Sequence, residues 1–211
     1  MDRRKFIKTM CLGCGAAMVS TMQTSLAKEY FSSLLEGKFI YKRKEDLPKH
    51  VCLESCSLCQ LNCAKCWIRA NEAQISKTEG LGYLKFSDFK NFVDDNPQLE
   101  TVAIANNGEI FLNPELDKII EYAHAKEIRL SAQTGVNLND LSDEMAECLV
   151  VNKFNDITVS IDGVTPETYA IYRRGGDFNK VIANIKKINK YKKKYNSEYP
   201  ILTLEIYSFR S

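Results

Sequence analysis

Residues 59–67, CQLNCAKCW, place three cysteines on one short segment. Three residues separate Cys59 from Cys63, and two separate Cys63 from Cys66. Cysteine thiolates hold iron–sulfur clusters, and three of them leave one iron of a four-iron cluster without a protein ligand. A structural zinc site normally takes four ligands in two separated pairs. The spacing therefore favours a cluster with an open iron.

Two cysteines that precede this triplet keep a second interpretation open. Cys52 or Cys56 could supply the fourth ligand that a zinc site requires. Cys52, Cys56 and Cys59 also repeat the spacing of the later triplet. We favour the later triplet because Cys52 falls within a strand candidate, His50–Glu54, and a cluster ligand is expected on the loop beyond that strand.

The composition is that of an ordinary globular chain with an unusual density of cysteine. Of the 211 residues, 45% are hydrophobic and 27% are charged, which suits one domain with a core and argues against disorder. The formal net charge is only +2, so we expect no nucleic-acid partner. Five of the eight cysteines lie within residues 52–66, which favours a metal site over a disulfide scaffold.

Strand-like and helix-like segments alternate from residue 47 onward. Strands are expected over residues 50–54, 99–105, 128–132, 157–161 and 201–207. Helices are expected over 86–93, 114–126, 142–149, from 165, and through 178–188. Asn113-Pro114, Ser142 and Thr165-Pro166 are typical helix starts. This alternation predicts right-handed βαβ units and a parallel α/β fold.

Chemistry in parallel α/β folds gathers on the loops at the carboxyl ends of the strands. The cysteine triplet follows the first expected strand, and Asn106–Glu109 follows the second. Gln133–Gly135 follows the third, and Ser160–Gly163 closes the fourth. We therefore expect these segments to meet at one end of the sheet.

Taken in order, these segments resemble the radical S-adenosylmethionine (SAM) enzymes over about residues 47–209. Residues 59–67 resemble the family's cluster loop. Residues 107–116, NGEIFLNPEL, resemble its Gly-Gly-Glu-Pro segment, with Asn107 replacing the first glycine and Ile110 the proline. Residues 160–169, SIDGVTPETY, and residues 173–178, RRGGDF, resemble members that carry a C-terminal SPASM-type extension.

The resemblance implies a partial (βα) barrel with about five βα units present. The family's core has six such units, and the likeness here stops at about the fifth strand. We therefore expect residues 47–211 to be a radical SAM core domain that is truncated at its C-terminus.

The resemblance also implies a set of cofactors and contacts. Cys59, Cys63 and Cys66 would hold a [4Fe-4S] cluster, and SAM would chelate its open iron. Gly108 and Glu109 would lie beside the methionine amino group of SAM, and Asp162 would lie near its ribose. Ser160 and one of the two adjacent arginines, Arg173 and Arg174, would lie near its carboxylate. Of these two arginines we take Arg174. No further catalytic residue is implied, because the cofactors carry the difficult chemistry.

The implied reaction is reductive cleavage of SAM to a 5′-deoxyadenosyl radical that abstracts hydrogen from a substrate. Analogy with the SPASM-bearing members suggests a peptide or a protein as substrate. An electron donor such as a flavodoxin or a ferredoxin is also implied.

Simpler structural explanations exist for the SAM-contacting residues. Gly108 could serve a turn with positive φ, and Glu109 could be a surface acid. Ser160 and Asp162 could be turn formers, and the arginines could be the solvated end of a helix.

The N-terminal segment has a different character. Residues 1–27 begin MDRRKFIK and continue through an uncharged stretch to Ser25-Leu26-Ala27, a pattern typical of a twin-arginine signal. An amphipathic helix or a membrane tether is the alternative, and residues 28–46 are expected to be a charged connector. The signal points to the twin-arginine export machinery or to tethering at the membrane. SAM and reduced clusters, in contrast, belong to the cytoplasm. The localisation therefore stays open between export or tethering and the cytoplasm.

Two other functions remain as alternatives. An exported iron–sulfur electron-transfer protein would use Cys52 or Cys56 as a fourth ligand. A non-catalytic zinc or disulfide module on a truncated family scaffold would have no cluster.

Overall fold

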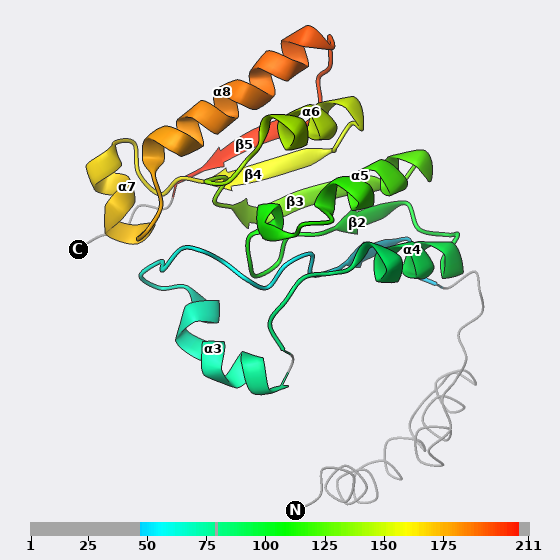
Figure 1. Cartoon of the computed structure of the whole chain (residues 1–211), viewed down its shortest axis with the longest axis horizontal. Coiled ribbons are helices and arrows are strands. Elements are labelled where there is room, and N and C mark those ends of the chain that lie inside the picture. Colours follow the sequence, from blue (N-terminus) through cyan, green and yellow to red (C-terminus); the bar gives the residue numbers. More distant parts are fainter. Residues whose placement is uncertain (1–46, 79, 207–211) are drawn as a thin grey trace, which may run out of the picture. The chain divides into compact units, whose positions relative to one another are not determined.

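The computed structural model of the chain describes residues 47–78 and 80–206 (Figure 1). The signal-like segment 1–27, the connector 28–46 and Tyr207 at the end of the last expected strand lie outside these residues. Contacts divide the chain after Leu47, and the unit that begins at Pro48 contains every element described below.

Within the described residues, five parallel strands form one sheet, in the order in which they occur along the chain. They are β1 (His50–Cys52), β2 (Thr101–Ala103), β3 (Arg129–Val136), β4 (Asp156–Ser160) and β5 (Ile201–Glu205). Parallel strands that pair in sequence order are produced by βα units that wind in one direction. The predicted α/β fold with about five βα units is confirmed.

Helices connect the strands, and four of those described pack side by side along one face of the sheet (Figure 1). Those four are α4 (Phe86–Asp95), α5 (Leu116–Ala125), α6 (Asp143–Val151) and α8 (Phe178–Lys194). The shorter α7 (Pro166–Tyr172) precedes α8, and α3 (Trp67–Thr78) follows the cysteines. No helix in residues 47–78 and 80–206 has the length and apolar character needed to cross a membrane.

The core lies between the sheet and these helices. Phe89 of α4, Val102 of β2, Ile119 of α5, Leu149 of α6 and Val181 of α8 are all fully buried and belong to one cluster. Each lies on the apolar face of its element, as the helical and strand periodicities require. This core fixes the strand ends on which the polar loops stand.

The expected caps of α6 and α7 are confirmed. The Ser142 hydroxyl accepts a hydrogen bond from the Met145 N–H at 3.0 Å. Thr165 and Thr168 form a reciprocal capping box, with Pro166 in the first turn of α7. Both caps satisfy N–H groups that have no partner inside the helix.

The start of α5 differs from the prediction, and α3 was not predicted. Residues Ile110–Leu112 form a 3₁₀ turn, and α5 begins at Leu116, two residues after Pro114. The Asn113 Oδ1 still accepts from the Glu115 N–H at 2.9 Å, just ahead of the helix, and its NH₂ group donates to the Ser55 carbonyl at 3.0 Å. Asn113 therefore joins the segment after β2 to the segment after β1.

Candidate active site

The cysteine loop lies against the loop that follows β2. The Glu109 N–H donates to the Leu58 carbonyl at 2.8 Å. A Cβ on Gly108 would lie 2.0 Å from the Cys56 carbonyl oxygen and 2.6 Å from that of Leu58. Glycine is therefore required here by the close approach of two backbones. The positive φ that was one explanation for Gly108 is found instead at Gly80, Gly135 and Gly175 among the described glycines.

The other side of the cysteine loop is held by the segment at the end of α7. The Asn62 N–H donates to the Arg174 carbonyl at 2.8 Å, and the Ala64 N–H donates to the Tyr172 carbonyl at 3.1 Å. At the start of α3, the Arg69 guanidinium donates to the Cys59 carbonyl at 2.6 Å. Contacts from the loop after β2, from the end of α7 and from the start of α3 thus fix the backbone that presents the cysteines.

The thiols of the predicted triplet share one half-buried environment. Cys59, Cys63 and Cys66 are each partly exposed and form no disulfide. Burial raises the pKa of the Cys59 thiol and of the Cys63 thiol, and the neighbouring thiols add to this effect. The three side chains therefore lie close enough to interact electrostatically.

The two earlier cysteines lie in different surroundings. Cys56 is fully buried, and its thiol donates to the Leu58 carbonyl at 3.8 Å. Cys52 is exposed and lies on β1, as the sequence predicted. In residues 47–78 and 80–206, no three His, Cys, Asp or Glu side chains are arranged to hold a single metal ion. A four-iron cluster makes a different demand, because each cysteine binds its own iron.

A buried ion pair faces the triplet. The Arg173 Nε and Nη2 atoms both lie 2.5 Å from Asp162 Oδ2, and Arg173 Nη1 lies 3.8 Å from Cys63 Sγ. The Asp162 side chain is completely buried, and its backbone is left-handed, with φ at 43°. Arg174 is exposed and contributes its carbonyl to the cysteine loop. The structure therefore brings Arg173 to the site, in place of the expected Arg174.

Glu109 is a buried acid and not a surface one. It is 1% exposed, and its carboxylate accepts from the Asn137 N–H at 2.6 Å and the Phe111 N–H at 3.4 Å. Burial raises the pKa of this carboxyl group to about 7, against the hydrogen bonds that lower it. At neutral pH its charge is thus poised between two states.

Ser160 ends β4 and is buried at the same end of the sheet. A Cβ on Gly135, whose φ is +99°, would lie 2.2 Å from the Ser160 Oγ. The pairing of β3 with β4 shifts register between Ala132 and Val136, a form of irregularity common beside active sites. The residues expected to follow the third strand, Gln133–Gly135, lie within β3, because that strand continues to Val136. The carboxyl ends of β3 and β4 nevertheless meet here.

Sequence reasoning missed the loop after β3. Asn137 and Asn139 are buried there, and the Asn137 side-chain amide donates to Cys59 Sγ at 3.6 Å. The sequence did offer a signal for these asparagines, because they lie just after the carboxyl end of a strand, where site residues are expected. Their partners became visible only with the fold.

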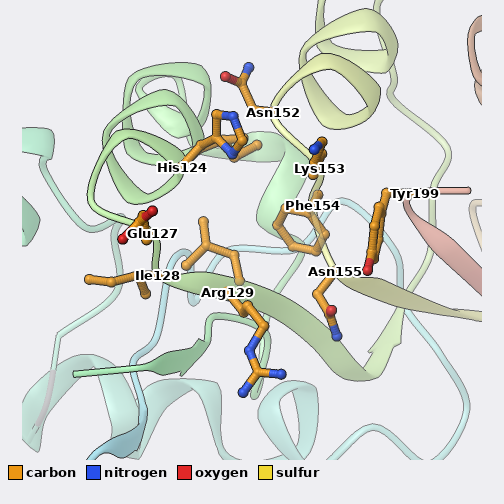
Figure 2. Close-up of a pocket in the computed structure, with 11 residues that line it drawn as sticks. His124, Glu127, Ile128, Arg129, Asn152, Lys153, Phe154, Asn155 and Tyr199 are labelled. Carbon is orange, nitrogen blue, oxygen red and sulfur yellow. The ribbon is translucent and has the colours of Figure 1, made fainter. Parts of the chain in front are cut away.

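A separate cleft of about 320 Å³ opens at the other end of the sheet (Figure 2). Arg129, Lys153, Phe154 and Tyr199 line it, on segments that begin or precede β3, β4 and β5. Functional sites of βα folds lie at the carboxyl ends of the strands. This cleft is therefore distinct from the cysteine site.

Comparison with known proteins settles the family. The model described as the radical SAM superfamily matches residues 53–205, from the cysteine loop through β5. The chain belongs to the radical SAM superfamily. Its curated relative AlbA of Bacillus subtilis (strain 168), an antilisterial bacteriocin subtilosin biosynthesis protein, is 31% identical over 145 residues. That match covers 66% of this chain and 30% of AlbA.

Solved structures of other radical SAM proteins share the fold. Streptococcus suis SuiB bound to the precursor peptide SuiA gives a TM-score of 0.59 at 15% identity, covering 88% of this chain and 38% of SuiB. The structure named anSMEcpe with bound AdoMet gives a TM-score of 0.51 at 18% identity, covering 74% of this chain and 42% of that one. This chain thus spans well under half of the length of each.

Membership of the radical SAM superfamily implies an iron–sulfur cluster and SAM, and the residues fit both. The triplet offers three half-buried thiols on one loop, the donor type that such clusters take. Beside it, Gly108 lets the backbone of the loop after β2 approach the cysteine loop closely, and Arg173 presents a cation. Thiolate, backbone and cationic groups are the chemistry that a cluster and an amino-acid-bearing cofactor would need.

Proposed function

We propose that this chain is a radical SAM enzyme in which Cys59, Cys63 and Cys66 hold a [4Fe-4S] cluster. When bound, the cluster supplies the electron that cleaves SAM to methionine and a 5′-deoxyadenosyl radical, which abstracts hydrogen from the substrate. The observation that carries this proposal is the approach of Arg173, held by Asp162, to Cys63 on a cysteine loop whose residues 56–58 pack closely against Gly108.

The chain's own residues would bind and orient SAM. The Gly108 backbone and the Glu109 carboxylate offer acceptors to its ammonium group, and Ser160 and Arg173 offer donors to its carboxylate. We assign Arg173 this role in place of Arg174, because Arg174 is exposed and Arg173 points to Cys63. Asp162 serves by holding the guanidinium, and its contact with the ribose stays a prediction.

We further propose a peptide or a protein as the substrate class. AlbA is named for bacteriocin biosynthesis, and SuiB was solved with a precursor peptide. A small electron-transfer protein such as a flavodoxin or a ferredoxin would deliver the electron. Residues 1–27 would direct the protein to the twin-arginine machinery or tether it to the membrane.

The test is anaerobic reconstitution of the full chain, with iron and sulfide counted and the reduced cluster followed by EPR. We expect four irons and four sulfides per chain, and an EPR signal that changes when SAM is added. Replacing Cys59, Cys63 and Cys66 together by alanine should abolish the cluster. The matched Cys52→Ala variant should retain it, because Cys52 is exposed on β1.

Other outcomes would overturn the proposal. A cluster whose signal ignores SAM, and which is lost in Cys52→Ala or Cys56→Ala, would indicate the electron-transfer protein. Zinc without sulfide, or oxidised cysteines, would indicate the non-catalytic module.

A further inference from the structure

The loop after β3 places one amide against the cysteine triplet. Asn137 is 3% exposed, and its Nδ2 atom lies 3.6 Å from Cys59 Sγ. This contact joins residues 78 positions apart in the chain. Asn137 therefore touches a cluster ligand from outside the cysteine loop.

The orientation of this amide is fixed by its neighbours. Asn137 Oδ1 accepts from the Asn139 N–H at 2.9 Å. A backbone N–H can only donate, so the amide oxygen must face Asn139 and the NH₂ group must face Cys59. The Asn137 backbone is held as well, because its N–H donates to Glu109 Oε2 at 2.6 Å.

Gln60 holds the same amide from the cysteine side. Asn137 Nδ2 donates to Gln60 Oε1 at 3.1 Å, and Gln60 Nε2 donates back to Asn137 Oδ1 at 3.3 Å. Gln60 Nε2 also donates to Asp140 Oδ2 at 2.7 Å, which fixes its own orientation. The donor that faces Cys59 is thus set by three hydrogen-bonding partners of Asn137, which are Glu109, Asn139 and Gln60.

We propose that Asn137 is a positioning residue that sets the reduction potential of the cluster through Cys59. This inference rests on the proposed function, since it requires the cluster. Reduction adds one negative charge to the cluster and its sulfurs, and a buried N–H donor stabilises that charge. Hydrogen bonds to the sulfurs are one of the factors that set cluster potentials. Asn137 would therefore make the cluster easier to reduce.

The test compares two variants of the full, reconstituted chain by EPR-monitored redox titration. Asn137→Leu removes the donor without adding charge. Asn137→Asp keeps the shape and the Asn139 contact but places an acceptor against the sulfur. An ordinary hydrogen bond changes an equilibrium by about tenfold. We expect the ratio of reduced to oxidised cluster at a fixed potential to fall about tenfold in Asn137→Leu, or about 59 mV for one electron, and further in Asn137→Asp.

Asn184→Leu is the matched control. The Asn184 amide donates to the Leu138 carbonyl at 2.9 Å and the Asn139 carbonyl at 3.3 Å, so it supports the same loop without touching Cys59. Its iron count and potential should match those of the unmodified protein. A shift in Asn184→Leu as large as that in Asn137→Leu would show that loop integrity sets the potential, and would refute the proposal.

The remaining outcomes separate a failure of the Asn137 proposal from a failure of the proposed function. A full cluster with unchanged potential in both Asn137 variants would refute the inference while leaving the proposed function intact. An unmodified chain that assembles no cluster would overturn the proposed function, and the inference with it. If Asn137→Leu fails to fold, two measurements remain. One is the potential of the Asn137→Asp variant. The other is the resonance Raman spectrum of the unmodified cluster, in which we expect the Fe–S bands to shift in deuterated solvent.

Discussion

Replacing Glu109 by glutamine should remove a pH-dependent destabilisation of the cluster-free protein. Glu109 is 1% exposed, and burial raises its pKa from the usual 4.5 to about 7. The folded state therefore holds the carboxyl proton more tightly than the unfolded chain does. Between these two pKa values the unfolded chain has released a proton that the folded protein retains. The free energy of unfolding must then fall as the pH rises through this window.

The size of the effect follows from the two pKa values. A difference between 4.5 and about 7, at roughly 1.4 kcal/mol per pKa unit, gives about 3 kcal/mol. The loss is absent below about pH 4.5, where both states are protonated, and complete above about pH 7, where both are ionised. Glutamine cannot ionise, so Glu109→Gln would lack this dependence.

The assay is urea unfolding of the cluster-free full chain at several pH values between about 4 and 8, with thiols kept reduced. Loss of hydrogen bonds to glutamine shifts the variant's stability by a constant amount, whereas ionisation changes the slope. The stability difference between Glu109→Gln and the unmodified protein should therefore move by about 3 kcal/mol across the window, in favour of the variant at high pH. Parallel profiles would refute the reasoning, since they would show that Glu109 ionises alike in both states.

Three further substitutions test how the site is built. Gly108→Ala should lower the free energy of unfolding by roughly 3 kcal/mol and abolish the effect of SAM on the EPR signal, because its Cβ would meet the Cys56 carbonyl at 2.0 Å. Gly82→Ala, which has open space around it, should unfold in urea like the unmodified protein. Asp162→Asn should cost roughly 3 kcal/mol in urea unfolding by leaving Arg173 without its charge partner, and an unchanged midpoint would contradict this. Thr165→Ala should cost about 1 kcal/mol by removing the capping box of α7, seen as a lower Tm.

Helices and strands in which apolar residues recur at a regular spacing were predictable, and those without such a spacing were not. The apolar spacing of Phe86, Phe89 and Val93 identified α4, and alternating strand signals identified the parallel sheet. Helix α3 was missed because, over its residues 67–77, only Ile68 and Ile75, seven residues apart, are buried. A single pair of apolar positions does not define a helical face.

The sequence predicted which segments form the site, but not which side chains in them make contact. Arg173 and Arg174 are adjacent, and which of them turns inward is decided by the backbone where α7 ends. Likewise, Asn113 followed by proline is a helix-cap signal, and its Oδ1 does accept from the Glu115 N–H. Its NH₂ group donates to the Ser55 and Leu84 carbonyls, and these partners became visible only with the fold.

Buried polar contacts at the carboxyl end of the sheet explain how the cysteine loop keeps its place. Glu109 joins the loop after β2 to the loop after β3 through the Asn137 N–H, and Asn137 joins that loop to Cys59. On the far side, Asp162 holds Arg173 against Cys63. Such groups contribute less stability than apolar packing would, because each must be desolvated. Their value lies in fixing direction, since a hydrogen bond sets an orientation that apolar contact does not. The sulfurs of Cys59 and Cys63 are therefore oriented by residues from two distant segments, the loop after β3 and the end of α7, so the geometry of the triplet depends on how the fold brings these segments together.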